Sequence, residues 1–312
     1  MRRPLTVAAL ATLLLGTGAC DRPASDAPAA SAPAENAATP RVRVASVRVR
    51  FDNGRPEFGG SAPSEDRLRA VAVFADADPR DRPVIEALVG QAAAGAPLLA
   101  IDTCVRQGSA GMPMAELPAL KPASWIQLLD VGNLELRAGG LSLPLQIRLL
   151  PAVIEATRGV RYDAAVERGR TFLASGPLAV SGTGGDGVAA FSAQVAVPRP
   201  VRITLVGETP PEGGLVRGLR AGELHVRWGS ADASADLELL AGSETSQEPV
   251  WLRCRPKDDG AFTLPVDLVA HLPARSPQRP WTVMVVRRSR AAVPGFAGQA
   301  LVLELADAVH VE

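Results

Sequence analysis

Residues 41–51, RVRVASVRVRF, decide the fold class of this 312-residue chain. Charged and β-branched side chains alternate over most of the stretch, and a period of two is typical of a β-strand with one buried face. Asn53 and Gly54 follow almost at once and are typical of the turns that close β-hairpins. We therefore predict a half-buried strand here and a second strand over residues 68–74.

Short apolar runs separated by turn residues fill most of the remaining sequence. One segment, 83–94, instead has apolar residues at helical spacing and ends at Gly95, which suits a helix C-cap. The regular spacing of the other runs is typical of β-sandwiches and barrels, whereas a doubly wound parallel sheet would alternate strands with helices. We expect further strands at 97–105, 125–129, 133–137, 141–149, 170–174, 191–197, 201–206, 222–228, 235–240, 250–255, 281–287 and 300–311.

The turn-rich stretch 207–214, GETPPEGG, lies between two strand-dense regions and is the best candidate for a domain boundary. A long hairpin loop would have the same composition. The expected fold is mainly β, with two antiparallel β-sandwich domains of immunoglobulin-like type and one or two short helices. The first domain would span residues 41–206, with a short helical insertion, and the second residues 207–312.

Residues 1–20 have the layout of a secretory signal. Arg2 and Arg3 supply positive charge, residues 5–15 form an apolar stretch, and small residues follow it. The apolar stretch is too short to span a bilayer, which needs about 20 residues, and no later segment is long enough and free of charge. We therefore expect an exported chain that is not an integral membrane protein.

Cys20, directly after Ala19, resembles the lipidated cysteine in the lipobox of bacterial lipoproteins. The resemblance implies that the Cys20 thiol receives a diacylglycerol and becomes the first mature residue, although Thr17 stands where the motif prefers Leu. The alternative is cleavage after Ala19, which would leave a secreted protein with a free Cys20. Residues 21–40 are mostly Ala, Pro, Ser and Asp, so we predict a disordered tether.

The formal net charge is zero, so neither nucleic acid nor an anionic surface is an obvious partner. We expect the membrane as a partner, through the lipid on Cys20, and consider an envelope protein as a second. Cys104 and Cys254 remain after Cys20, and an even pair in an oxidising envelope most simply forms a disulfide. The alternative is two separate buried thiols.

Two kinds of cluster could bind a ligand, and each has a simpler explanation. Glycines in residues 181–187, SGTGGDG, could approach a phosphate, but the Lys-Ser/Thr ending and the helix of a P-loop are missing, which favours a hairpin turn. Asp76, Asp78 and Asp81 could hold calcium, but they lack EF-hand spacing and suit a helix start. Asp258 and Asp259 before Gly260 similarly indicate a turn rather than a metal site.

No catalytic signature is evident. His225, His271 and His310 are far apart, have no paired metal-ligand spacing and accompany no nucleophile elbow. A hydrolase could still assemble distant residues, and it would then place one of these histidines beside a carboxylate or nucleophile in a cleft. Aromatic residues are only 4% of the chain. The tryptophans lie in strand-like runs and are expected in the core: Trp125, Trp228, Trp251 and Trp281.

The sequence from Trp251 to Arg287 resembles the C-terminal half of uncharacterised lipoproteins with immunoglobulin-like β-sandwich domains from high-GC Gram-negative bacteria. Residues 133–144 and 175–197 share the pattern. The resemblance implies architecture and carries no activity, catalytic residue, metal or cofactor. We therefore expect a non-enzymatic binding or structural module, anchored in the cell envelope through Cys20, with an envelope hydrolase as the alternative.

Overall fold

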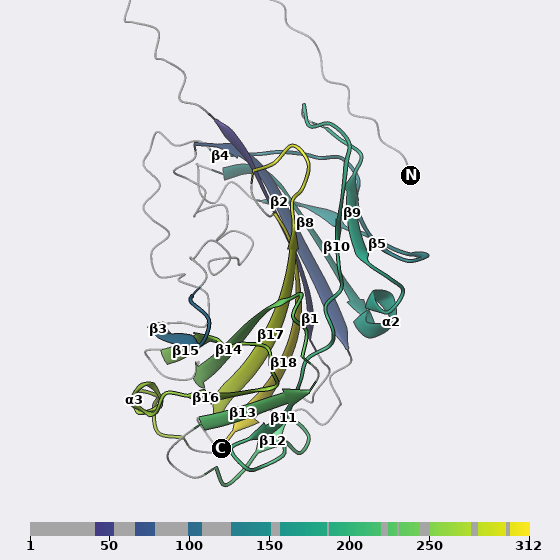
Figure 1. Ribbon diagram of the computed structural model, residues 1–312. Coiled ribbons are helices and arrows are strands. Elements are labelled where there is room, and N and C mark those ends of the chain that lie inside the picture. The colour runs from purple at the N-terminus through teal and green to yellow at the C-terminus, as the bar shows by residue number, and fades with distance from the viewer. Residues whose placement is uncertain are drawn as a thin grey trace, which may run out of the picture. The chain divides into compact units, whose positions relative to one another are not determined.

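The computed structural model describes residues 41–52, 66–78, 99–107, 126–150, 157–185, 187–219, 224–229, 231–243, 250–275, 280–297 and 300–312. These residues form eighteen strands and two short helices, which confirms a mainly β fold (Figure 1). The predicted helix at 83–94 and the turn at Asn53 and Gly54 lie outside the described residues, as do Cys20 and residues 21–40. No helix in the described part of the chain is long and apolar enough to cross a membrane.

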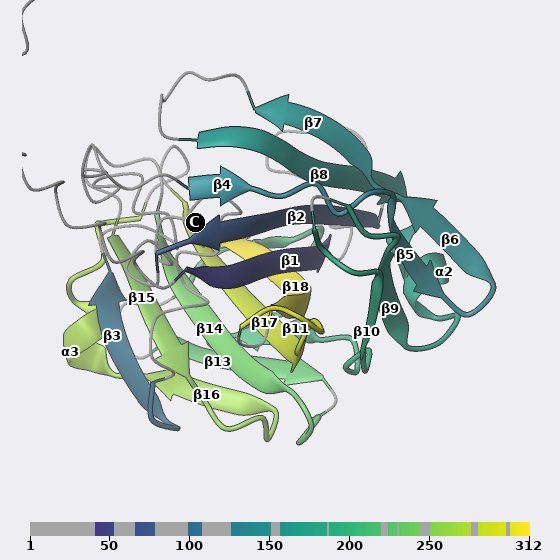
Figure 2. The same cartoon turned by 90° about the horizontal axis from the view of Figure 1, so that it is seen from above.

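One large sheet of eleven strands runs through the described part of the chain (Figure 2). β12 (Leu215–Val216) pairs with β18 beside the main path. The main path contains, in order, β3 (Thr103–Gln107), β15 (Val250–Arg255), β14 (Asp236–Ser243), β17 (Trp281–Ala291), β18 (Leu301–Val311), β1 (Val42–Asp52), β2 (Arg67–Ala77), β4 (Ile126–Leu128), β8 (Thr157–Glu167) and β7 (Gln146–Leu150).

The opening stretch forms β1 as predicted, but its pairing corrects the purely antiparallel arrangement that we expected. β1 is antiparallel to β2 and parallel to β18, with Val47 opposite Leu301 and Asp52 opposite Ala306. β4 and β8 are also parallel. A hairpin forces neighbouring strands to be antiparallel, whereas strands joined through a long connection are free of that constraint. The large sheet is therefore mixed.

Two small sheets pack on one face of the large sheet. The four-stranded sheet contains β10 (Phe191–Val195), β9 (Leu178–Gly182), β5 (Leu134–Ala138) and β6 (Leu141–Pro144), and the three-stranded sheet contains β11 (Arg202–Val206), β13 (Leu224–Gly229) and β16 (Ala261–Leu264). β18 reaches both. Leu301 and Leu305 join the core under the four-stranded sheet, and Val309 and Val311 join the core under the three-stranded sheet.

The first core consists mainly of residues 45–195, together with residues 293–305, and the second mainly of residues 201–311. Val201 and Ile203 already belong to the second core although they precede the predicted boundary at 207. The large sheet continues across both cores. The division into two domains, 41–206 and 207–312, stays a prediction.

Several local predictions need correction. Residues 170–174 were expected as a strand but form helix α2 (Gly169–Leu173). β8 ends just before Arg168, which has φ 64°, so the backbone turns there instead of continuing extended. The expected strand 141–149 is interrupted at Leu145, where the chain passes from β6 in the small sheet to β7 in the large one. The second helix, α3 (Val266–Val269), follows β16.

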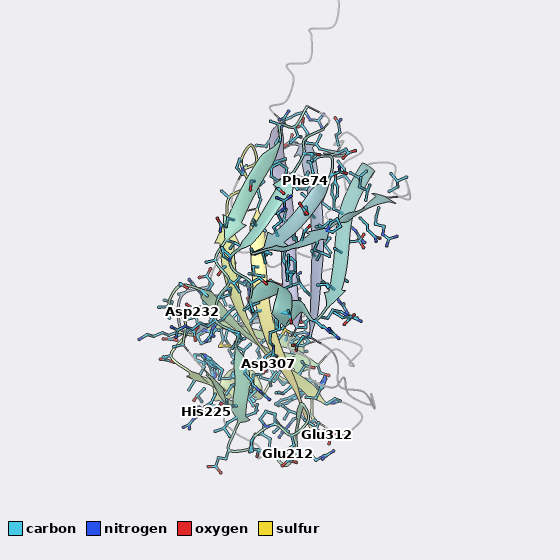
Figure 3. The ribbon with its side chains drawn as sticks, turned by 90° about the vertical axis from the view of Figure 1, so that its right-hand side faces the viewer. Phe74, Glu212, His225, Asp232, Asp307 and Glu312 are labelled. Carbon is cyan, nitrogen blue, oxygen red and sulfur yellow. A yellow bond between two sulfur atoms is a disulfide. The ribbon has the colours of Figure 1, made fainter. Side chains whose placement is uncertain are left out.

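A buried ion pair lies where the two small sheets meet. The guanidinium of Arg287 is fully buried and makes two hydrogen bonds to Asp258, of 2.7 and 2.9 Å. It also donates to the carbonyls of Arg199 and Pro200, in the segment that links the small sheets. Asp307 on β18 accepts a hydrogen bond from the Ile203 N–H at 2.6 Å. Figure 3 shows Asp307 between Phe74, in the first core, and Glu312.

The opposite face of the large sheet carries a buried charge network. Glu304 accepts hydrogen bonds from Arg48 at 2.8 Å and from Arg288 at 2.7 Å. Arg288 also pairs with Glu238, which in turn pairs with Arg253. Burial opposes ionisation of Glu304, but the charges of Arg288 and Arg48 outweigh it and lower its pKa to about 2. Glu304 therefore stays ionised at neutral pH.

Candidate functional site

A pocket of about 460 Å³ lies at one end of the second core. It is formed by α3, the chain that follows α3 as far as Arg275, the first residue of β17 and Glu312, which follows β18. In Figure 1 this is the end that carries α3 and the C-terminal residue. The volume lies within the range of small-molecule sites, roughly 300–1,000 Å³.

The pocket wall is mostly apolar because faces of the second core reach the surface here. Leu224 is the first residue of β13 and Trp281 is the first residue of β17, and both side chains are buried. Val269 and Leu272 are three residues apart, so they lie on one side of α3 and the turn after it. Val266 at the rim is 58% exposed. The pocket thus presents apolar surface to solvent.

Arg275 supplies a positive charge against this wall. Its Nη2 donates to the Leu219 carbonyl at 2.8 Å, and its guanidinium carbon lies 4.8 Å from the centroid of the Trp281 ring. The Trp281 indole N–H donates to the Pro273 carbonyl at 2.8 Å, which holds the ring in place. Burial lowers the pKa of Arg275 from its ordinary value, but a guanidinium still stays charged at neutral pH.

The Arg275 guanidinium has one nitrogen that no described residue pairs with. Its Nη1 is buried, and none of the described residues accepts a hydrogen bond from it. Nor does any ion pair within the described ranges include Arg275. A buried donor without an acceptor costs about 1–3 kcal/mol. Arg275 is therefore a fixed cation with unused hydrogen-bonding capacity at an apolar pocket.

Glu312 is the other charged residue that lines the pocket. Its carboxylate lies 3.4 Å from Nε of Arg217, and its backbone N–H donates to the Val216 carbonyl at 3.0 Å. Figure 3 shows its position at the end of β18. Since Glu312 is already paired with Arg217, the charge that is left for a ligand in this lining is that of Arg275.

The structure brings together two of the residues that the sequence singled out. Cys104 on β3 and Cys254 on β15 lie directly opposite each other and form a disulfide, as predicted. The bridge fastens β3, which is the outermost strand of the large sheet on that side. Cys20, the predicted lipidation site, lies outside the described residues.

The three histidines lie on different elements. His225 on β13 shares hydrogen bonds with Thr263, at 2.9 Å, and with Arg227, at 3.0 Å. His271 follows α3 and is exposed. His310 on β18 lies 3.3 Å from the Thr282 hydroxyl, and burial lowers its pKa. The expectation of a non-enzymatic module stays a prediction, as does its hydrolase alternative.

The glycine-rich segment begins in β9, with Ser181 and Gly182, and its other described residues, 183–185 and 187, lie between β9 and the antiparallel β10, which agrees with the predicted hairpin; Gly184 and Gly187 have positive φ. Asp76 pairs with Arg41 at 3.1 Å, whereas Asp81 lies outside the described residues. No group of three or more His, Cys, Asp or Glu within the described ranges could hold a metal ion.

Sequence reasoning placed Asp258 in a turn and Trp281 in the core, and both statements hold, but it missed what each residue contacts. Asp258 neutralises Arg287 and accepts a hydrogen bond from the Trp228 indole at 2.9 Å. Trp281 is buried and also forms part of the pocket wall. Arg275 carried no local signal, because only the folded chain brings it over Trp281. Trp228 and Trp251 are buried as expected, and Trp125 lies outside the described residues.

Comparison with known proteins gives no family for this chain. No protein-family model matches it, and no curated protein matches it.

Proposed function

We propose that this chain is a lipid-anchored protein of the bacterial cell envelope that acts as a non-enzymatic binding module. The observation that carries the binding role is the pocket of about 460 Å³, with its apolar wall and with Arg275, whose charge is used by no ion pair of the described residues. The anchoring role rests on the signal-like residues 1–19 and on Cys20. Together they favour a body that holds a small ligand close to a membrane.

The proposal keeps the two-sandwich architecture. Each core lies between the large sheet and one small sheet, as in a β-sandwich, and the pocket belongs to the second core alone. In this view residues 41–206 form a supporting immunoglobulin-like domain, and residues 207–312 form the domain that binds. The membrane is a partner through Cys20, and an envelope protein that delivers or receives the ligand is a second.

The anchor is tested by metabolic labelling of the full chain with an alkyne-bearing fatty acid in a Gram-negative host. We expect label on the wild-type protein and none on Cys20→Ala, because only the thiol of the first mature residue accepts the diacylglycerol. Cys20→Ala should also leave the membrane fraction if its signal is still cleaved. An unlabelled wild-type protein would refute the lipid anchor.

The binding role is tested by filling the pocket. Ala270 follows α3, lines the pocket and is exposed, so Ala270→Trp should occupy the ligand's space without disturbing the core. Wild-type protein purified from membranes should release a small apolar compound into an organic extract, and Ala270→Trp should release far less. Ala174→Trp is the matched control, because Ala174 follows α2 and lies away from the pocket lining. Equal extracts from wild-type protein and Ala270→Trp would contradict the proposal.

A further inference from the structure

We infer that the pocket binds an anionic amphiphile with an alkyl tail, whose head group pairs with Arg275. This inference rests on the proposed binding function and specifies its ligand class. The shared chemistry is a compact anionic oxygen group on an unbranched apolar tail. A fatty carboxylate and an alkyl phosphate both have it.

Arg275 has a fixed position at the pocket, which favours a charged head group there. The guanidinium is held by the Leu219 carbonyl and by the face of Trp281, so it does not need to be ordered again when a ligand binds. Arg275 lines the pocket, and no ion pair among the described residues uses its charge. A carboxylate or phosphate would supply charged acceptors, and hydrogen bonds between two charged groups are roughly twice as strong as neutral ones.

The rest of the pocket lining is apolar and favours an apolar tail. Apart from Arg275 and Glu312, the lining side chains are Leu, Val, Ala, Pro and Trp, so most of a ligand's surface would meet apolar groups. Burying each methylene of a tail contributes about 0.8 kcal/mol. A compact polar anion such as free phosphate would satisfy Arg275 but would leave this surface exposed to water. An alkyl chain with an anionic head group would contact the apolar wall and pair with Arg275.

The remaining charges select the sign of the head group. The negative charge of Glu312 is paired with Arg217, whereas no ion pair of the described residues uses Arg275. A cationic amphiphile would meet the positive charge of Arg275, and a neutral one would leave that charge without a counter-charge in the pocket. Charge complementarity therefore favours the anion.

The experiment uses the full lipidated chain in isolated membranes, where no further acylation of Cys20 takes place. Two probes carry a diazirine and an alkyne on the same chain, one ending in a carboxylate and the other in a hydroxyl. After irradiation, labelled peptides are mapped by mass spectrometry. We expect the carboxylate probe to label the segment 266–281, and either dodecanoate or dodecyl phosphate to compete more strongly than dodecyltrimethylammonium. The better competitor identifies the head group.

Variants of Arg275 separate recognition of the anionic head group from binding of the apolar tail. Arg275→Gln should weaken carboxylate labelling about tenfold or more, which corresponds to about 1.4 kcal/mol, and should leave labelling by the hydroxyl probe almost unchanged. Arg275→Lys keeps the charge without the planar fork and should recover part of the labelling. Arg170→Gln, which removes an exposed arginine on α2, is the matched control and should behave as wild type.

The failures are distinguishable. If both probes label 266–281 equally, and only Ala270→Trp abolishes the label, the pocket binds apolar ligands and the anionic head group is wrong. If Ala270→Trp labels as strongly as wild type, the pocket is not the site, and the proposed binding function fails with the inference.

Discussion

Glu304→Gln should remove a defined, pH-dependent part of the stability of the large sheet. The pKa of Glu304 falls from 4.5 to about 2 on folding, because Arg288 and Arg48 outweigh the cost of burial. A shift of this size corresponds to roughly 3 kcal/mol. Since the folded-state pKa is the lower one, this stability is complete above about pH 4.5 and is lost as the pH falls through 2.

Glutamine has the shape of a protonated glutamate, so it reproduces the acid form of the site at every pH. At pH 7, Glu304→Gln leaves Arg48 and Arg288 without this carboxylate, and breaking a buried pair costs about 3–5 kcal/mol. Near pH 2 about half of the wild-type carboxyl groups are protonated, so most of the pH-dependent difference should be lost there. The two stability curves should therefore converge as the pH falls.

The assay is urea denaturation at a series of pH values from 2 to 7, followed by circular dichroism and tryptophan fluorescence. Glu167→Gln is the control, because the Glu167 side chain is 45% exposed and its pair with Arg67 lies at the surface. Such a pair contributes about 0–1 kcal/mol, so Glu167→Gln should follow the wild-type curve closely. A Glu304→Gln curve that stays parallel to wild type down to pH 2 would refute the electrostatic account of this network.

Three other outcomes are expected. Reduction of the Cys104–Cys254 bridge should destabilise the chain by ~5 kcal/mol in the chain-entropy model, since it closes a loop with a sequence separation of 150; an unchanged urea midpoint under reducing conditions would contradict this. Arg287→Met should lower the free energy of unfolding by about 3–5 kcal/mol, because it leaves the buried Asp258 carboxylate without its counter-charge. In a double-mutant cycle, adding Asp258→Leu should recover much of this loss. Purely additive effects would show that the two residues are not coupled. Burial lowers the pKa of His310 from 6.5, so its stabilising contribution should be complete above pH 6.5 and decline as the pH falls through the lowered value. An NMR titration of His310 in the folded and in the denatured chain measures both pKa values. Equal values in the two states would refute this pH dependence.

Most strands were predictable because their signal is local, although β8, β9, β12 and β16 were missed. Alternation over residues 41–51 needs no partner to be visible, and β1 appears where the pattern predicts it. Residues 170–174 show the limit of the same method. A short apolar run does not distinguish a strand from a single helical turn, and the decisive feature, the left-handed backbone at Arg168, depends on what surrounds it.

Pairing and the pocket were not predictable because both depend on residues far apart in the chain. The sequence near Val47 does not indicate that Val47 lies opposite Leu301, or that the two strands are parallel. The pocket similarly needs Leu219, Arg275, Trp281 and Glu312 to meet. The disulfide was the exception, since the number of cysteines and the expected oxidising compartment left few alternatives.

The parallel pairing of β1 with β18 has a mechanical consequence. Force from a membrane-bound tether would enter at the N-terminal end of β1, while a load held in the pocket would pull near Glu312, at the C-terminal end of β18. Two parallel strands pulled this way slide along each other, so the six paired positions from Val47–Leu301 to Asp52–Ala306 would bear the force together. If the proposed anchor and ligand are correct, the parallel pair β1 and β18 would resist such a load in shear, through backbone hydrogen bonds that must break together.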